Sequence, residues 1–400
     1  MSLPDNLLDA GQKKTEMVPL RLRPGGPWDR IMSKAPRKPF VIHGEEIAPG
    51  RRRTIDIPLS RLADHTRMHL GVQVIHGKSS GPVLFVSGAI HGDEIIGVEI
   101  IRRLSEVKAL SRLKGTLILV PIVNAYGFIT HSRYLPDRRD LNRSFPGAEK
   151  GSLAAQLAHI FMKEVVSRSD FGIDLHSAAV HRDNFPQIRA NLGNPEVLAM
   201  ARAFGATIML DSRLRDGSLR AEGQERGCDI LLYEAGEALR FNETAIRIGV
   251  KGVLNVMRHK GMLPPSKGSK PAAEPIRTAR SHWERAPIGG IMRAYRGLGD
   301  SVDADELLAV VSGPLGEDEM EVRARSKGVV IGRSNLPIVN RGDALFHIAE
   351  TGRGTDVDAT HDAIEAAVEA DPLFDGMEIV CAPENMRMAL RSIAIDSQDH

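Results

Sequence analysis

Between residues 83 and 260, short apolar runs alternate with longer amphipathic stretches. Val83 to Val86 is an apolar run that follows Gly81-Pro82, which is typical of a buried strand. The next stretch, Ile95 to Leu110, repeats apolar residues every three or four positions and predicts an amphipathic helix. Thr116 to Val123 is a second apolar run. Strand, helix and strand in this order predict the βαβ unit of a parallel sheet.

The same alternation continues along the chain and predicts an α/β fold with a mixed, largely parallel sheet flanked by helices. Ahead of the first buried strand, the alternating residues 53–75 predict two antiparallel edge strands. Ser152 and Asn242 stand where the N-caps of two helices are expected. The remaining predicted strands are 170–175, 207–210 and 229–233, and the remaining predicted helices are 152–166, 194–205 and 242–260.

Residues 264–275, PPSKGSKPAAEP, are a proline-rich break that predicts a linker. Beyond it, short apolar runs and glycine turns in residues 276–352 predict a small all-β domain. Its segments 299–302 and 341–346 resemble the half-repeats of a biotinyl/lipoyl-like sandwich. Lys327 lacks the flanking residues of a lysine that carries a cofactor, so we expect a structural or substrate-gating domain.

The predicted organisation therefore has five parts along the chain. The Ala/Glu-rich stretch 358–370 predicts a surface helix at the start of the last part. The sequence assigns no role to the first and last parts. The five parts are an N-terminal arm at 1–50, a catalytic α/β domain at 51–263, the linker at 264–275, the β domain at 276–352 and a helical C-terminal tail at 353–400.

Composition excludes some classes of protein. The net charge of +2 and the aromatic content of 4% argue against nucleic-acid binding. The chain has no apolar run of about 18 residues, so we expect no membrane span. Cys228 and Cys381 form neither a disulfide framework nor a cysteine zinc site, and we expect a cytoplasmic protein. Whether it is a monomer or a homo-oligomer is left open by the sequence.

Polar residues follow four of the predicted strands: His91, Asn124, His176 and Glu234. In an open parallel sheet, ligands bind outside the carboxyl ends of the strands, so these residues are predicted to meet at one edge. Chance can place a polar residue after one strand. Glu94 follows His91 at a spacing that lets one helical turn or tight loop bring both side chains together. Chance seldom supplies two histidines and two glutamates in this arrangement.

The pair His91 and Glu94 is weak evidence by itself, because a surface turn with a histidine and an acid is common. Together with His176 it makes a set of two histidines and one glutamate. Three protein ligands leave a fourth position for water, which is typical of catalytic rather than structural zinc. We therefore expect one Zn²⁺ per chain.

Hydrolysis also needs a general base beside the water. Glu234 is the first choice, because it is a carboxylate at a further strand end and is followed by Gly236. Glu237 is the competing candidate. Asp174 alternates with the strand's inward positions and is expected to orient His176 through a hydrogen bond.

The long loop 125–151 is rich in arginine, aspartate and asparagine. Loops of this length inside compact domains are usually functional or disordered. Guanidinium groups bind carboxylates through paired hydrogen bonds, and asparagine can add another. Arg133, Asn142 and Arg143 therefore suggest a small anionic substrate, although a solvated basic loop would have the same composition.

Four motifs, in this order, make the sequence resemble the succinylglutamate desuccinylase/aspartoacylase family. They are HGDE at 91–94, RDLNRSFPG at 139–147, DLHS at 174–177 and EAG at 234–236. The family is related to the zinc carboxypeptidases, and the resemblance extends over roughly residues 50–350. It implies a zinc carboxypeptidase-like fold and a zinc-dependent amidohydrolase that removes the acyl group from an N-acyl amino acid.

By this resemblance, the family's three zinc ligands fall on His91, Glu94 and His176, and its water-activating base falls on Glu234. Its substrate-binding pair falls on Asn142 and Arg143, which would hold the substrate carboxylate. The family's catalytic arginine falls on Arg133, which would polarise the scissile carbonyl or grip a second carboxylate. Arg133 lies further from the Asn-Arg pair than in aspartoacylase.

Two other functions are compatible with the sequence. The same metal and Asn-Arg pair would serve a zinc carboxypeptidase acting on a short peptide, although an added β domain would narrow access and favour small substrates. A non-catalytic sheet domain with a ligand-binding β module is the second alternative. The presence of every ligand and of the base argues against it. The acyl group and the amino acid are not identified by the sequence.

Overall fold

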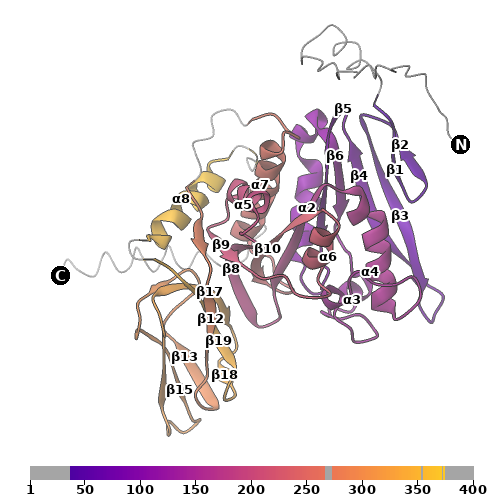
Figure 1. The fold of residues 1–400 in the computed structure, drawn as a ribbon. Helices are drawn as coiled ribbons and strands as arrows, with labels where there is room; N and C mark the ends of the chain where they lie inside the picture. The colour runs from indigo at the N-terminus through magenta and orange to yellow at the C-terminus, as the bar shows by residue number, and fades with distance from the viewer. Residues whose placement is uncertain (1–36, 266–272, 353–354, 372, 374–400) are drawn as a thin grey trace, which may run out of the picture. The chain divides into compact units, whose positions relative to one another are not determined.

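The computed structural model describes residues 37–265, 273–352, 355–371 and 373 (Figure 1). Its main feature is a mixed sheet of 13 strands, in which ten follow the order β12-β19-β17-β8-β10-β7-β5-β6-β4-β3. The strands are β3 (Arg51–Arg61), β4 (Arg67–His76), β5 (Ser79–Gly88), β6 (Lys114–Val120), β7 (Phe171–Ala178), β8 (Arg182–Ala190), β9 (Ile208–Asp211), β10 (Asp229–Glu237), β11 (Ile276–Thr278), β12 (Ser281–Arg285), β14 (Ser301–Val302), β17 (Gly328–Ser334) and β19 (Ala344–Glu350).

The predicted mixed sheet is present, but it is parallel only at its centre and around β9. The prediction that the sheet is largely parallel was therefore wrong for its outer strands. β6, β5, β7 and β10 are parallel neighbours, and β9 is parallel to β8 and β11. All the other pairs in this sheet are antiparallel, including the predicted edge pair of β3 and β4. A parallel pair needs a long crossover connection, such as residues 89–113 between β5 and β6 and residues 191–207 between β8 and β9.

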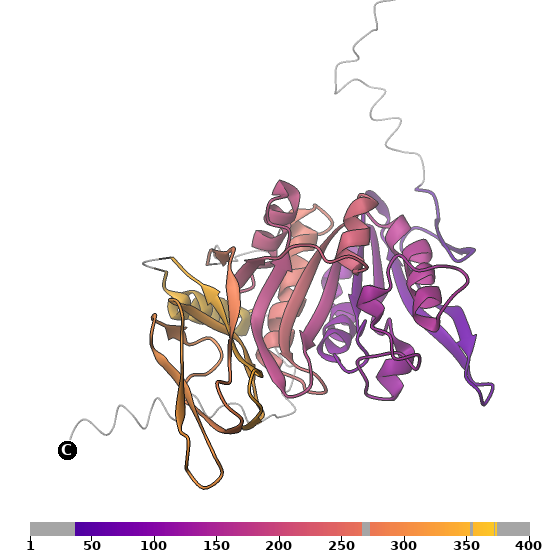
Figure 2. The same cartoon turned by 60° about the horizontal axis from the view of Figure 1, so that its bottom comes forward.

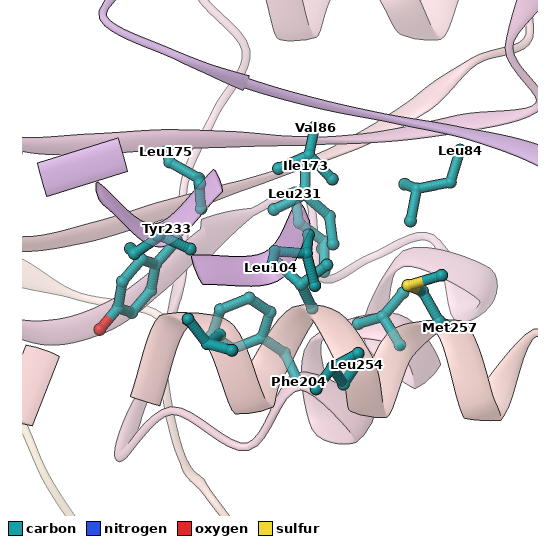
Figure 3. Packing of buried hydrophobic residues seen from close by; sticks show 14 of the residues in the cluster. Leu84, Val86, Leu104, Ile173, Leu175, Phe204, Leu231, Tyr233, Leu254 and Met257 are labelled. Carbon is teal, nitrogen blue, oxygen red and sulfur yellow. The ribbon is translucent and has the colours of Figure 1, made fainter. Parts of the chain in front are cut away.

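Helices cover both faces of the central strands (Figures 1 and 2). Alternate residues of β5 show why: Leu84 and Val86 enter one hydrophobic cluster, and Phe85 enters the other. Figure 3 shows the first cluster, in which Leu104 and Phe204 lie against the sheet. It contains α2 (Ile96–Glu106), α5 (Pro195–Phe204) and α7 (Glu243–His259), whereas the second contains α3 (Ala125–Ile129), α4 (Leu153–Glu164) and α6 (Leu219–Glu225).

Two predicted helix caps are confirmed. The Ser152 side chain accepts a hydrogen bond from Ala155 N and begins α4, and the Asn242 side chain accepts from Ala245 N and begins α7. The helix predicted to reach Leu110 ends earlier, at Glu106. Three short 3-10 helices complete this region: η1 (Lys108–Arg112), η2 (Leu141–Arg143) and η3 (Val166–Arg168).

The all-β region after residue 275 shares strands with the main sheet. Gly332 of β17 pairs with Asn184 of β8, so β17, β19 and β12 continue the sheet beyond the α/β part. A second sheet of four strands packs against them through residues such as Leu308, Val311 and Phe346. Its strands are β13 (Gly290–Ala294), β15 (Leu307–Ser312), β16 (Met320–Arg323) and β18 (Ile338–Val339).

The predicted arm was wrong for residues 40–47. They form a hairpin of β1 (Phe40–Ile42) and β2 (Glu45–Ile47), whose Ile42 and Ile47 are buried in the second cluster. The turn has positive φ at His43 and Gly44, as a tight two-residue hairpin requires. Residues 1–36 lie outside the described part of the chain.

The predicted C-terminal helix is present as α8 (Val357–Glu369), which begins at an Asp356 cap. Ile364 and Val368 join the first hydrophobic cluster and attach α8 to the α/β part. Most of the predicted linker and the tail after residue 373 are outside the described residues. None of the described helices is long and apolar enough to cross a lipid bilayer.

Candidate metal centre and active site

The turn after β5 brings His91 and Glu94 together. Glu94 N donates to His91 O at 3.1 Å, and both side chains are buried. His91 Nδ1 lies 2.7 Å from Glu94 Oε1. Gly92 permits this turn, because a Cβ there would stand 2.0 Å from the backbone of Gly127 in α3.

His176 of β7 completes the cluster from 82 residues further along the chain. Its Nδ1 lies 2.7 Å from Glu94 Oε2, so each carboxylate oxygen of Glu94 faces one imidazole. The possible ligand atoms of His91, Glu94 and His176 all lie within 4.8 Å of one another. Two imidazole nitrogens and one carboxylate oxygen form a donor set that suits zinc.

The electrostatics of the cluster also suit a cation. Burial alone would raise the pKa of the Glu94 carboxyl, but the charges and hydrogen bonds of His91 and His176 hold that pKa far below its usual range. Burial likewise opposes a charge on His176, yet Asp174 and Glu94 raise its pKa well above the ordinary value. The carboxylates therefore favour positive charge at this position. A metal ion would take the place of these protons.

Each histidine also contacts a carboxylate through its other ring nitrogen. His176 Nε2 lies 2.7 Å from Asp174 Oδ2, which is the contact expected from the sequence, and Ser87 Oγ donates to Asp174 Oδ1 at 2.7 Å. His91 Nε2 lies 3.1 Å from Asp140 Oδ1. These contacts leave the Nδ1 atoms directed to the cluster.

Asp140 is a site residue that sequence reasoning did not single out. Besides His91, it contacts Arg133, whose Nη2 donates to Asp140 Oδ2 at 3.1 Å. It also accepts a hydrogen bond from the backbone N of Asn142 at 2.8 Å, which shapes the loop. The only signal in the sequence was its position between Arg139 and Asn142 in the arginine-rich loop.

Arg133 reaches the metal cluster from this loop. Its Nη1 donates to Glu94 Oε1 at 2.9 Å, and its side chain is 27% exposed, so it can still meet a ligand. Asn124, one of the four polar residues predicted at strand ends, does not join the metal cluster. Its side-chain oxygen accepts from Gly127 N and begins α3, and its Nδ2 donates to Arg133 O at 3.4 Å. Asn124 thus supports the backbone of Arg133.

Asn142 and Arg143 lie on the short helix η2. The side-chain oxygen of Asn142 accepts a hydrogen bond from Leu219 N at 2.9 Å, which anchors the loop to α6. The Arg143 side chain is exposed and donates to the carbonyl oxygen of Asn142. Among described residues it has no ion-pair partner, so its guanidinium is available to an anion.

Glu234 lies directly opposite His176 in the parallel register of β10 and β7. It is inside β10 rather than at the predicted strand end, because the strand continues to Glu237 after an irregularity at positive-φ Gly236. Asn184 Nδ2 donates to Glu234 Oε2 at 2.7 Å. Sequence reasoning missed Asn184, since nothing in its local pattern marks it.

The competing glutamate, Glu237, has both carboxylate oxygens engaged elsewhere. Oε1 accepts from the backbone N of His181 at 2.8 Å, and Oε2 accepts from Asn335 Nδ2 at 3.0 Å. These contacts attach it to the turn before β8 and to the loop after β17. The arrangement therefore favours Glu234 as the base.

Part of the chain matches a known protein family. The family model described as Succinylglutamate desuccinylase/Aspartoacylase catalytic domain matches residues 80–260. Residues 80–260 belong to the succinylglutamate desuccinylase/aspartoacylase family. That range contains all seven site residues expected by resemblance, from His91 to Glu234.

The chain is 28% identical over 285 residues to N-alpha-acetyl-L-2,4-diaminobutyric acid deacetylase of Halomonas elongata, covering 68% of this chain and 83% of that relative. A succinylglutamate desuccinylase/aspartoacylase structure from Rhodobacter sphaeroides matches with a TM-score of 0.67 and 27% identity. The match covers 75% of this chain and 96% of that structure. The product-bound Ectoine utilization protein EutE (DoeB) from Ruegeria pomeroyi matches with a TM-score of 0.68 and 26% identity. The match covers 79% of this chain and 100% of that structure. The relatives that are named by activity are deacylases of N-acyl amino acids.

Proposed function

We propose that this chain is a zinc-dependent amidohydrolase that hydrolyses the amide bond of a small anionic N-acyl amino acid. The observation that carries the proposal is the position of Glu234 opposite His176, beside the buried cluster of His91, Glu94 and His176. A ligand cluster and a separate carboxylate at one sheet edge are the parts that hydrolysis of an amide requires. We also propose that the fold is zinc carboxypeptidase-like.

His91, Glu94 and His176 would hold one zinc ion. When bound, zinc acts as a Lewis acid that polarises a carbonyl and lowers the pKa of water. Asp174 and Asp140 orient the two imidazoles, so that their Nδ1 atoms are presented together.

Glu234 acts as general base and then as general acid. Its carboxylate takes a proton from the attacking water and later delivers it to the leaving amine nitrogen. The hydrogen bond from Asn184 fixes Oε2 of this carboxylate, while Oε1, which lies 3.8 Å from Arg189 Nη1, faces the reacting groups. Asn184 is therefore a positioning residue for the base.

Arg133 and the Asn142–Arg143 pair handle the charges of the substrate. The guanidinium of Arg133, close to Glu94, stabilises the negative charge that develops on the scissile carbonyl oxygen. Arg143 binds the substrate's α-carboxylate, and Asn142 adds a hydrogen bond through its side-chain nitrogen. This binding places the amide beside Glu234.

We propose that residues 51–263 form the catalytic domain and that residues 276–352 form a β domain, which narrows the entrance to the active site. In support, Asn184 of β8 contacts both Glu234 and the strand β17, and Asn335 after β17 contacts Glu237. The all-β region thus lies beside the proposed base. This position favours small substrates over extended peptides.

The test is a panel of N-acetyl and N-succinyl amino acids and short peptides, assayed with protein that contains one zinc per chain. We expect hydrolysis of at least one N-acyl amino acid and little cleavage of peptides. Preferential release of C-terminal residues from peptides would instead favour a zinc carboxypeptidase. Inactivity on both classes would contradict the proposed function.

A further inference from the structure

A hollow of about 320 Å³ lies beside the turn between β4 and β5. Its walls are the start of β3, this turn, and the segment from the end of α2 to η1. The volume is at the lower end of the range of small-molecule sites in proteins. Lys78, in one wall, precedes β5, whereas His91 of the metal cluster follows β5. The ten residues of β5 separate these two positions by roughly 30 Å, so the hollow is distinct from the proposed active site.

The inner part of the hollow is apolar. Ile75, Val107 and Leu110 line it, and all three are buried and belong to the first hydrophobic cluster. We call these three residues the apolar wall. Gly77, which also lines the hollow, adds only backbone, because a Cβ there would stand 2.0 Å from Leu113 O. An apolar group that enters the hollow is therefore removed from water against side chains that the fold already buries.

The outer part of the hollow is basic. Arg51, Arg52, Lys78 and Lys108 line it, and all four are exposed. We call these four residues the basic rim. Among the described residues, no acid forms an ion pair with any of them.

The lining contains one acid, Glu106, and this acid already has a partner. Its Oε2 accepts a hydrogen bond from Arg102 Nη1 at 3.5 Å. Four cations therefore face one carboxylate whose charge is shared with a further arginine. The rim keeps a surplus of positive charge, which attracts an anion from solution.

Two side chains of the basic rim are held in place by the fold. Arg52 lies opposite Ile75 in the antiparallel register of β3 and β4, so both side chains are on the same face of the sheet. Gly50 has a φ of +77°, and a Cβ there would stand 2.9 Å from Lys78 Cγ. The aliphatic part of Lys78 therefore packs on the backbone of Gly50. Both cations are thus presented at the edge of the apolar wall.

The chemistry of the rim suits a phosphate group. Guanidinium and ammonium groups are the side chains that bind phosphate oxygens, through charge-assisted hydrogen bonds. A phosphate monoester carries a charge of about −1.5 to −2 at pH 7 and has three acceptor oxygens. A single carboxylate carries less charge and would neutralise less of the surplus.

We propose that this hollow is a binding site for a small organic phosphate. The apolar part of the ligand lies against the apolar wall, and its phosphate binds the basic rim, chiefly Arg52 and Lys78. The proposal is independent of the proposed hydrolase, because the hollow shares no residue with the metal cluster, the base or the substrate-binding pair.

The probe is AMP, titrated calorimetrically into the full-length, zinc-loaded protein at low ionic strength. Adenosine and inorganic phosphate, each of which is one half of the probe, are titrated in parallel. AMP should bind more tightly than either half, because only AMP meets both the apolar wall and the basic rim. Arg143→Ala, which alters the proposed substrate site, should bind AMP like wild type, and so should protein from which a chelator has removed the metal.

The test variant is Arg52→Gln/Lys78→Gln. The control is Arg61→Gln/Arg67→Gln, which removes two exposed arginines that pair at the other end of the same β3–β4 hairpin. Both double variants change the net charge equally and alter only exposed side chains, so the Tm without ligand should stay near that of wild type. The Kd for AMP should rise at least about tenfold in the test variant, since a hydrogen bond to a charged group contributes that much or more. It should not change in the control.

Absence of AMP binding by wild type, or an equal Kd in the test variant and the control, would overturn the site. Loss of binding in Arg143→Ala or after removal of the metal would place AMP in the proposed active site and overturn it too. Inorganic phosphate that binds as tightly as AMP would contradict the role of the apolar wall. Adenosine that binds as tightly as AMP would contradict the role of the basic rim.

Discussion

Glu234 of β10 lies directly opposite His176 of β7 in the parallel register of these strands. Residues that are opposite each other on neighbouring strands point to the same face of the sheet. The sheet itself thus places a carboxylate next to an imidazole of the metal cluster, without help from a flexible loop. A base held by a rigid element beside the metal ligands is the arrangement on which the proposed mechanism depends.

The first prediction concerns metal content. His176→Ala removes one of three ligand groups and should lose zinc as well as activity, because two ligands bind the ion much more weakly. His131→Ala, an exposed histidine in the loop before Arg133, is the control and should retain zinc. Elemental analysis after dialysis measures the outcome. Stoichiometric zinc in His176→Ala would show that His176 is not a ligand.

The second prediction concerns Asp140, which contacts His91 Nε2 and Arg133. Asp140→Ala should fold and bind zinc, but with an affinity lower by about 10- to 100-fold, as is usual when the partner of a metal-bound histidine is removed. Competition with a chromophoric chelator measures the affinity. The exposed Asp216→Ala is the control, and equal affinities in the two variants would argue against the role of Asp140.

The third prediction concerns substrate binding. Arg143→Ala removes an exposed guanidinium that we assign to the α-carboxylate, so KM should rise while zinc content stays normal. A loss of about 1.5–3 kcal/mol is expected for a hydrogen bond to a charged group. Arg139→Ala, an exposed arginine of the same loop, is the control. Unchanged kcat/KM for every active substrate would remove Arg143 from the site.

The fourth prediction concerns stability in acid. His347 of β19 is buried, stacks on Trp283 with ring centroids 4.7 Å apart, and its Nε2 lies 2.9 Å from Ser281 Oγ. Burial, with the charges of Arg189 and His282, lowers its pKa to about 3. In the unfolded chain the pKa is about 6.5, so between these values the unfolded chain binds the proton.

The stability that depends on neutral His347 is therefore present above a pH of about 6.5 and is lost as the pH falls toward 3. His347→Gln cannot take up this proton. Between pH 7 and pH 4.5, urea unfolding should show a larger decrease in the free energy of unfolding for wild type than for His347→Gln. Equal decreases would mean that His347 already accepts a proton in the folded protein.

The elements that carry the metal cluster could be predicted from local sequence patterns. The apolar run of β5, the period of α2 and the caps at Ser152 and Asn242 are local signals, and each was confirmed. The hairpin β1–β2 also has a local signal, the turn His43-Gly44 between apolar residues. It was missed because the basic and proline-rich surroundings suggested a solvated arm.

The partners of the site residues could not be predicted, because they depend on contacts between distant segments. Asn184 reaches Glu234 across 50 residues, and β8 joins β17 across more than 140. No periodicity in either strand specifies its neighbour.

The most direct test of the account is the kinetics of Glu234→Gln, with Glu237→Gln as the matched control. The amide keeps the shape of the side chain but cannot accept the proton from water. We predict retained fold, one zinc per chain and retained substrate binding, with kcat lower by about 10²–10⁴-fold, the usual contribution of a general base. Glu237→Gln should stay near wild type. A loss of less than tenfold in zinc-loaded Glu234→Gln, or loss of its zinc, would contradict the assignment of Glu234 as the base.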